Sequence, residues 1–97
     1  MKLQTLVKKR INQRQIDNKY KVYIFGSYIK DEVNANDIDL LIVYNKHYIS
    51  VTDILNERKY LSKLIHDELH LDSDICILTE EEYNYDDMMK NTRKIEI

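Results

Sequence analysis

The sequence predicts a small α/β domain in which helical segments alternate with short strands. Apolar residues recur at a helical period in some segments and form short β-branched or continuous apolar runs in others. A chain of 97 residues has the length of one small domain, so we expect residues 1–97 to form a single domain. The expected order is α-β-α-β-α-β-α, an α/β (α+β) arrangement with about three strands in a small mixed sheet flanked by helices.

The first half of the chain predicts one helix followed by two strands. The segment at residues 20–25 is rich in aromatic and β-branched residues and ends at Gly26, which is typical of a strand. Residues 38–44 are apolar at nearly every position, which favours a strand covered on both faces in the middle of the sheet. An apolar stripe at helical spacing predicts the first helix, and it consists of Leu3, Leu6, Val7 and Ile11.

The second half predicts a long helix, a third strand and a last helix. Ser50 and Asp53 have the spacing of a helix cap, and the helix is expected to run to about Leu69. Asp74 is expected to open a strand over residues 75–78, and Thr79 to start a helix through a second capping box. Beyond about residue 89 the sequence is polar, and we assign no element. The positions of the long helix expected to face inward are Ile54, Leu55, Leu61, Leu64 and Ile65.

Composition argues against several classes of partner. A formal net charge of −2 is too weak to indicate a nucleic-acid or membrane partner. Lys8, Lys9, Arg10 and Arg14 give the first helix a basic face, which we interpret as a solvated surface. A single cysteine, Cys76, cannot form an internal disulfide, and in its apolar run it is expected to pack as a small hydrophobe. The N-terminal residues predict neither a signal peptide nor a membrane span, so we expect a cytoplasmic protein.

The most distinctive segment joins the only glycine of the chain to a pair of aspartates. Gly26 directly precedes Ser27, and Asp37 and Asp39 stand at the head of the apolar strand. A chain so sparing with glycine is expected to use it where the backbone must approach another group closely. Because side chains alternate along a strand, Asp37 and Asp39 should point to the same face.

Topology brings a third carboxylate to the same place. The end of the first strand and the start of the second can meet only if these strands are antiparallel. The long helix then forms a crossover that makes the third strand parallel to the second. Asp74, at the start of the third strand, is therefore expected at the same edge of the sheet as Asp37 and Asp39.

These features together resemble the minimal nucleotidyltransferases of the DNA polymerase β superfamily. The match covers residues 20–78 and combines Gly-Ser at a strand end, Asp-x-Asp heading a buried strand, and a further aspartate after a crossover helix. The resemblance implies a polymerase β-like fold and a transferase that uses two Mg²⁺ ions and a nucleoside triphosphate. It also implies that Asp37 and Asp39 bind metal, and that Asp74 completes the metal site and helps to activate the attacking hydroxyl.

The same resemblance assigns the nucleotide-binding residues. The turn at Gly26 and Ser27 would hold the β and γ phosphates, and Lys30 would face phosphate. Tyr28 either stacks on the base or packs in an ordinary way. Where many relatives carry a second glycine, this chain has Asp31 and Glu32, whose negative charge opposes triphosphate binding and leaves an inactive relic as an alternative.

The resemblance also implies an acceptor and a partner. Larger relatives append a domain that recognises the acceptor, and we expect none within these 97 residues. Minimal nucleotidyltransferase antitoxins pair with helical HEPN toxins, so the chain would transfer AMP from ATP to a toxin hydroxyl, typically of tyrosine. The segment from Tyr83 onward and the basic first helix are the expected contacts. A non-catalytic binding antitoxin and the catalytic subunit of a two-chain enzyme acting on a small molecule are the alternatives.

One further motif imitates a zinc site. The stretch from His66 to His70 has the spacing of the zinc-protease helix motif, but Asp67 replaces the required glutamate and is one carbon too short. We interpret these residues as two polar histidines near a helix end.

Overall fold

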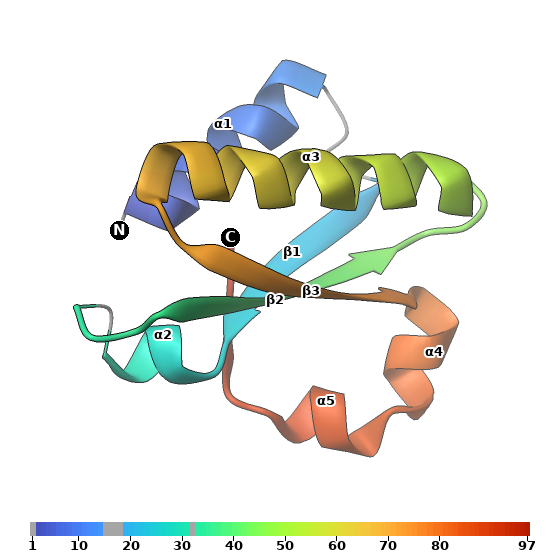
Figure 1. Ribbon diagram of the computed structural model, residues 1–97. Helices are drawn as coiled ribbons and strands as arrows, with labels where there is room; N and C mark the ends of the chain where they lie inside the picture. Colours follow the sequence, from blue (N-terminus) through green and yellow to red (C-terminus); the bar gives the residue numbers. More distant parts are fainter. Residues whose placement is uncertain (1, 15–18, 32) are drawn as a thin grey trace.

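The computed structural model describes residues 2–14, 19–31 and 33–97 (Figure 1). These residues form a mixed α/β fold, as the sequence predicts. The elements in chain order are α1 (Lys2–Arg14), β1 (Tyr20–Phe25), α2 (Ser27–Lys30), β2 (Asp37–Tyr44), α3 (Val51–Leu69), β3 (Asp72–Thr79), α4 (Glu80–Tyr85), α5 (Asp87–Asn91) and β4 (Lys94–Glu96).

The four strands form one sheet in the order β3-β2-β1-β4. Strand β1 is antiparallel to both β2 and β4, and β2 is parallel to β3, so the predicted relations of the first three strands are confirmed. The fourth strand was not expected. It has only three residues, and its segment is polar, so it shows none of the periodicity from which a strand can be predicted.

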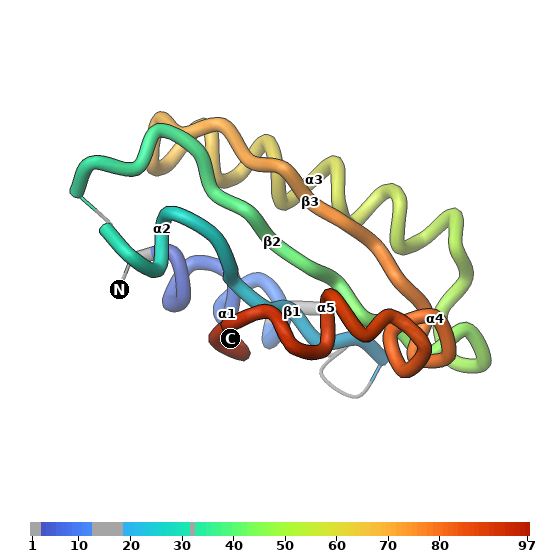
Figure 2. Tube along the Cα trace, turned by 90° about the horizontal axis from the view of Figure 1, so that it is seen from below, coloured from blue at the N-terminus to red at the C-terminus, as the bar shows by residue number. Residues whose placement is uncertain are grey.

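Helices lie on both sides of this sheet. In Figure 1, α1 and α3 lie above it and α4 and α5 below it, and Figure 2 shows the sheet from the side of α4 and α5. The main core fills the space between the sheet and the first pair of helices. Its fully buried members include Leu3, Val7, Val22, Ile24, Ile38, Leu40, Ile42, Ile54, Leu61 and Ile65.

The two ends of helix α3 are set by a side-chain cap at Ser50 and by a left-handed residue at His70. The Ser50 hydroxyl accepts a hydrogen bond from the Asp53 amide at 3.1 Å, which confirms the predicted cap. The helix ends at His70, whose φ of 56° is left-handed and stops the helical hydrogen bonding. Because His70 is outside the helix, it does not share a helix face with His66, and the zinc-like spacing has no structural counterpart.

The buried stripe of α3 differs from the prediction at two positions. Leu55 is 43 % exposed rather than inward-facing, whereas Glu57 is 3 % exposed. The Glu57 carboxylate is held by Arg10 of α1, with Nε to Oε1 at 2.9 Å, and the Arg10 guanidinium stacks on the ring of Tyr60 at 3.6 Å. Arg10 therefore joins α1 to α3 instead of forming part of a solvated basic face, and the side chain of Arg14 lies outside the described part of the structure.

The C-terminal segment completes the sheet and covers its second face. The capping box of α4 is confirmed, since Thr79 and Glu82 exchange two hydrogen bonds at 2.9 and 3.1 Å. Lys94 Nζ donates to the carbonyls of Met89, Lys90 and Thr92 and lies above the rings of Tyr23 and Tyr83. The segment thus extends the sheet beyond the three expected strands, because β4 pairs with β1.

Within the described residues, no helix has the length and the apolar character needed to cross a membrane.

We expect Glu57→Ala to lower the free energy of unfolding by about 3 kcal/mol, because it leaves the Arg10 guanidinium, which is 12 % exposed, without this carboxylate. Urea denaturation would measure the loss. Glu81→Ala is the control, since Glu81 is exposed and its pair with Lys46 at 3.9 Å lies in solvent, so the midpoint should change much less. Equal midpoints for the two variants would contradict a stabilising role for the α1–α3 pair.

Candidate functional site

The centre of the candidate site is a close contact between Gly26 and Asp39. Gly26 has a φ of 80° and immediately precedes α2. A Cβ atom added to Gly26 would overlap the Asp39 Oδ2 atom and lie 3.2 Å from Cγ and 3.3 Å from Cβ of Asp39. Both the backbone conformation and the space therefore require glycine here. The prediction that the backbone approaches another group at this position is confirmed, and that group is a carboxylate.

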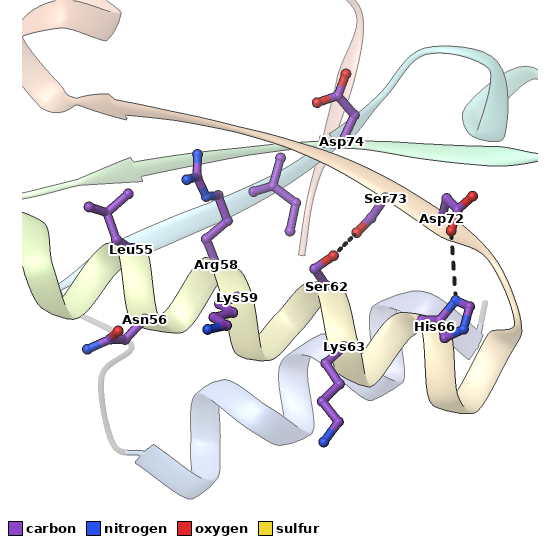
Figure 3. Close-up of a pocket in the computed structure, with 11 residues that line it drawn as sticks. Leu55, Asn56, Arg58, Lys59, Ser62, Lys63, His66, Asp72, Ser73 and Asp74 are labelled. Carbon is purple, nitrogen blue, oxygen red and sulfur yellow. Dashed lines mark hydrogen bonds and ion pairs between the residues drawn. The ribbon is translucent and has the colours of Figure 1, made fainter.

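Strand register gathers four carboxylates on one face of the sheet. Asp37 pairs with Asp72 and Asp39 pairs with Asp74 across the parallel strands β2 and β3. Because paired residues and alternate residues share a face, all four lie on the same side. The intervening Ser73 points to the other side, where its hydroxyl is 3.1 Å from that of Ser62 on α3 (Figure 3). The predicted meeting of Asp37, Asp39 and Asp74 at one edge is confirmed.

These carboxylates repel one another. Partial burial raises the pKa of Asp39 above its usual range, and the charges of Asp74 and Asp37 raise it further. Among the described residues, no group of three or more acidic, histidine or cysteine side chains is arranged as a ligand set for a metal ion. The acids thus share one face without converging. A set of mutually repelling carboxylate oxygens nevertheless suits Mg²⁺, which prefers hard oxygen ligands and keeps several waters or phosphate oxygens.

Asp72 and Asp74 have different surroundings. Strand β3 begins at residue 72 rather than at 74, so both point to the same face. Asp72, however, is the first residue of this edge strand, and its 87 % exposed side chain reaches α3, where it lies 3.8 Å from His66 Nδ1. Asp74 instead pairs with Asp39 across the two strands, and its charge helps to raise the pKa of Asp39. The structure therefore associates Asp74, and not Asp72, with the central carboxylate.

The predicted nucleotide-binding residues on helix α2 differ in their exposure to solvent. Ser27 and Lys30 are exposed. Tyr28 is only 4 % exposed and belongs to the main core, so of its two expected roles the structure supports ordinary packing and not stacking on a base. A helix of four residues gives no period from which to predict its buried side, so the sequence could not distinguish the two roles of Tyr28.

The loop after α2 keeps its negative charge. The Asp31 carboxylate accepts hydrogen bonds from the amide and side chain of Asn34 at 3.2 and 2.7 Å, and these hydrogen bonds lower its pKa. Asp31 lines a pocket of about 310 Å³ together with Ser27 and Asp37. The expected negative charge beside Ser27 is confirmed for Asp31, while Glu32 lies outside the described residues.

A second, smaller pocket of about 190 Å³ lies at Gly26. It is lined by Gly26, Ile29, Lys30, Thr92 and Arg93. Arg93 was missed by sequence reasoning because it lies in the polar C-terminal segment, which shows no periodic pattern. It reaches the site because β4 returns to pair with β1.

A groove of about 760 Å³ lies between α3 and the edge strand β3 (Figure 3). Its walls carry the cations Arg58, Lys59 and Lys63 on α3 and Asp74 on β3. Figure 3 shows Asp74 on the side of β3 away from α3, at the border of the groove. Two residues further along β3, Cys76 is exposed, so the expectation that it packs as a small hydrophobe is wrong.

We expect Asp39→Asn to stabilise the metal-free protein at neutral pH. The raised pKa of Asp39 means that folding favours its neutral form, so its contribution to stability is full below about pH 3.9 and is lost as the pH rises through the folded-state pKa. The melting temperature of the variant in a chelator should therefore exceed that of the wild type at pH 7, and the difference should shrink toward pH 3.

Asp31→Asn is the control of opposite sign. The lowered pKa of Asp31 gives stability that is present above the unfolded-state pKa and lost as the pH falls, so this variant should not be stabilised at pH 7. A lower melting temperature for metal-free Asp39→Asn at pH 7 would contradict the repulsion inferred here.

Comparison with known protein families matches residues 5–97 to the nucleotidyltransferase domain. Neither the comparison with curated proteins nor that with solved structures gave a significant match. The family match covers nearly the whole chain, including the Gly26 turn and both strands that carry the aspartates, β2 and β3. The chain therefore belongs to the nucleotidyltransferase domain family, within the polymerase β-like superfamily.

Proposed function

We propose that this domain transfers AMP from ATP to a hydroxyl group, with Asp37, Asp39 and Asp74 as its catalytic carboxylates. Membership of the family establishes nucleotidyl transfer in general terms. The observation that carries the proposal is the position of Asp39, which touches the Gly26 turn on one side and pairs with Asp74 on the other. A phosphate-binding turn and two further carboxylates thus surround a single side chain.

Each residue has a role in this proposal. Asp37, Asp39 and Asp74 would hold two Mg²⁺ ions, which when bound neutralise the charge of the triphosphate and stabilise the departing pyrophosphate. Ser27 and the Gly26 backbone would bind the β and γ phosphates. Asp74 would accept the proton of the acceptor hydroxyl as its oxygen forms a bond to the α-phosphorus and the bond to pyrophosphate breaks.

The acceptor is proposed to approach through the groove between α3 and β3. Asp74 lies at the border of this groove, and Arg58, Lys59 and Lys63 make its α3 wall basic. The nucleotidyltransferase domain accounts for residues 5–97, which leaves no separate acceptor-binding domain within them, so we propose that another chain supplies the acceptor. We propose a tyrosine hydroxyl of a helical HEPN-type toxin, for which the chain would be the antitoxin.

A non-catalytic antitoxin is the second candidate, and two observations favour it. The described acidic residues do not converge on a metal position, and Asp31 keeps a negative charge beside Ser27 and Asp37. If the chain acts only by covering its toxin, mutation of the aspartates should leave neutralisation intact.

ATP binding should depend on Mg²⁺ and on Asp39. Titration calorimetry with ATP should show binding by the wild type in Mg²⁺ and little in a chelator, because only a cation relieves the repulsion among the carboxylates. Asp39→Asn should lose this binding, and Asp74→Ala should retain most of it. Asp53→Asn, an exposed aspartate at the start of α3, is the control and should bind as the wild type does. A wild type without Mg²⁺-dependent ATP binding would contradict the active enzyme.

Transfer should depend on Asp74 much more than on Asp72. Intact-mass spectrometry of a helical protein encoded beside this chain and expressed with it should show added AMP. Asp74→Ala should reduce the modification rate by about a hundredfold or more, because the proton acceptor is lost. Asp72→Ala should be mild, since Asp72 faces His66. The opposite ranking would mean that Asp72 is the third carboxylate, and modification of a free small molecule instead would favour the two-chain enzyme.

A further inference from the structure

The C-terminal segment places a second cation beside the phosphate-binding turn. We propose that Arg93 and Lys30 form an anion-binding pocket that takes the terminal phosphates of the nucleoside triphosphate. This inference rests on the proposed function, and it makes the segment after α5 part of the substrate site.

The position of Arg93 follows from the pairing of β4 with β1. Lys94 pairs with Phe25, so the preceding residue, Arg93, comes next to Gly26. In Figures 1 and 2 the C-terminal stretch, drawn in red, passes beside the junction of β1 and α2. Lys30 reaches the same pocket from the last turn of α2. Two residues more than 60 positions apart in the sequence therefore line one pocket with the only glycine.

The two positive charges in this pocket favour the binding of an anion. Within the part of the chain that the structure describes, neither Lys30 nor Arg93 has a recorded ion pair, and no acidic residue lines the pocket. The neighbouring Lys94 is different, because its ammonium group is occupied by three backbone carbonyls. Two cations that share a pocket repel each other unless an anion lies between them.

Size and location indicate which anion fits. Pockets that enclose a whole small ligand measure roughly 300–1,000 Å³, so about 190 Å³ suits part of a nucleotide, such as its phosphates, better than a base. Gly26 lines this pocket and also contacts Asp39, so phosphates bound here would continue directly to the carboxylates. A guanidinium group binds phosphate through two parallel hydrogen bonds, which suits Arg93 to this role.

The test compares ligands that differ only in their terminal phosphates. Calorimetry in Mg²⁺ would measure ATP and AMP binding to the wild type, Arg93→Ala and Arg93→Lys. Lys90→Ala is the matched control, because it removes one exposed positive charge from the same segment without lining the pocket. We expect Arg93→Ala to weaken ATP binding about tenfold or more and to leave AMP binding unchanged. Arg93→Lys should be intermediate, and Lys90→Ala should match the wild type.

Inorganic tripolyphosphate without metal provides a second measurement that does not depend on the carboxylates. It should bind the wild type and Lys90→Ala, and binding should weaken about tenfold in Arg93→Ala and in Lys30→Ala. If the melting temperature shows that Arg93→Ala does not fold, Lys30→Ala and Arg93→Lys still test whether this pocket binds phosphate.

The outcomes separate this inference from the proposed function. Mg²⁺-dependent ATP binding that is equal in Arg93→Ala and Lys90→Ala would overturn the role of Arg93 and leave the proposed function standing. Equal losses of ATP and AMP binding would also overturn it, because the contact would then not be with the terminal phosphates. Tripolyphosphate binding without any ATP binding in Mg²⁺ would overturn the proposed function and retain an anion pocket.

Discussion

The candidate site depends on one steric constraint, the contact between the Gly26 backbone and the Asp39 carboxylate. Gly26 directly follows strand β1, and Asp39 lies in strand β2. The two residues are close because Phe25, the last residue of β1, pairs with Asp39 in the antiparallel ladder. A side chain at position 26 would have to displace the carboxylate, and it would also have to adopt an unfavourable positive φ. The single glycine of the chain therefore fixes how close the turn before α2 comes to the acidic end of the sheet.

The acidic face works against the stability of the fold, and other parts of the molecule offset this cost. Burial and two neighbouring charges disfavour ionised Asp39 in the absence of a cation. On the opposite face, the sheet packs against α1 and α3 through a continuous apolar core, and the Arg10–Glu57 pair joins the two helices. Natural proteins commonly tolerate such local strain where function requires it. The charge is confined to the end of the second face that carries the aspartates, because further along β2 Leu41 and Val43 are buried on that same face.

The sequence predicts those features that depend on local pattern or on strand topology. Strands β1 and β2 and helix α3 follow from composition and period, and the meeting of Asp39 with Asp74 follows from the crossover helix, which makes β3 parallel to β2. The role of Tyr28 stayed open between base stacking and packing because α2 is too short to show a period. Cys76 was misassigned because β3 lies at an edge of the sheet. Arg93 was missed because a three-residue strand that pairs with a distant segment leaves no local signal.

The order of strands suggests a direction for the proposed reaction. Across the sheet from β3 to β4, the residues in question run from Asp74 to Asp39, then to Gly26, and then to Arg93. In phosphoryl and nucleotidyl transfer the attacking and leaving oxygens lie roughly in line on opposite sides of the phosphorus. If Asp74 activates the acceptor and Arg93 binds the terminal phosphates, the acceptor enters on the side of β3 and pyrophosphate departs on the side of β4. The sheet then separates the two approaches by placing the carboxylates of β2 between them.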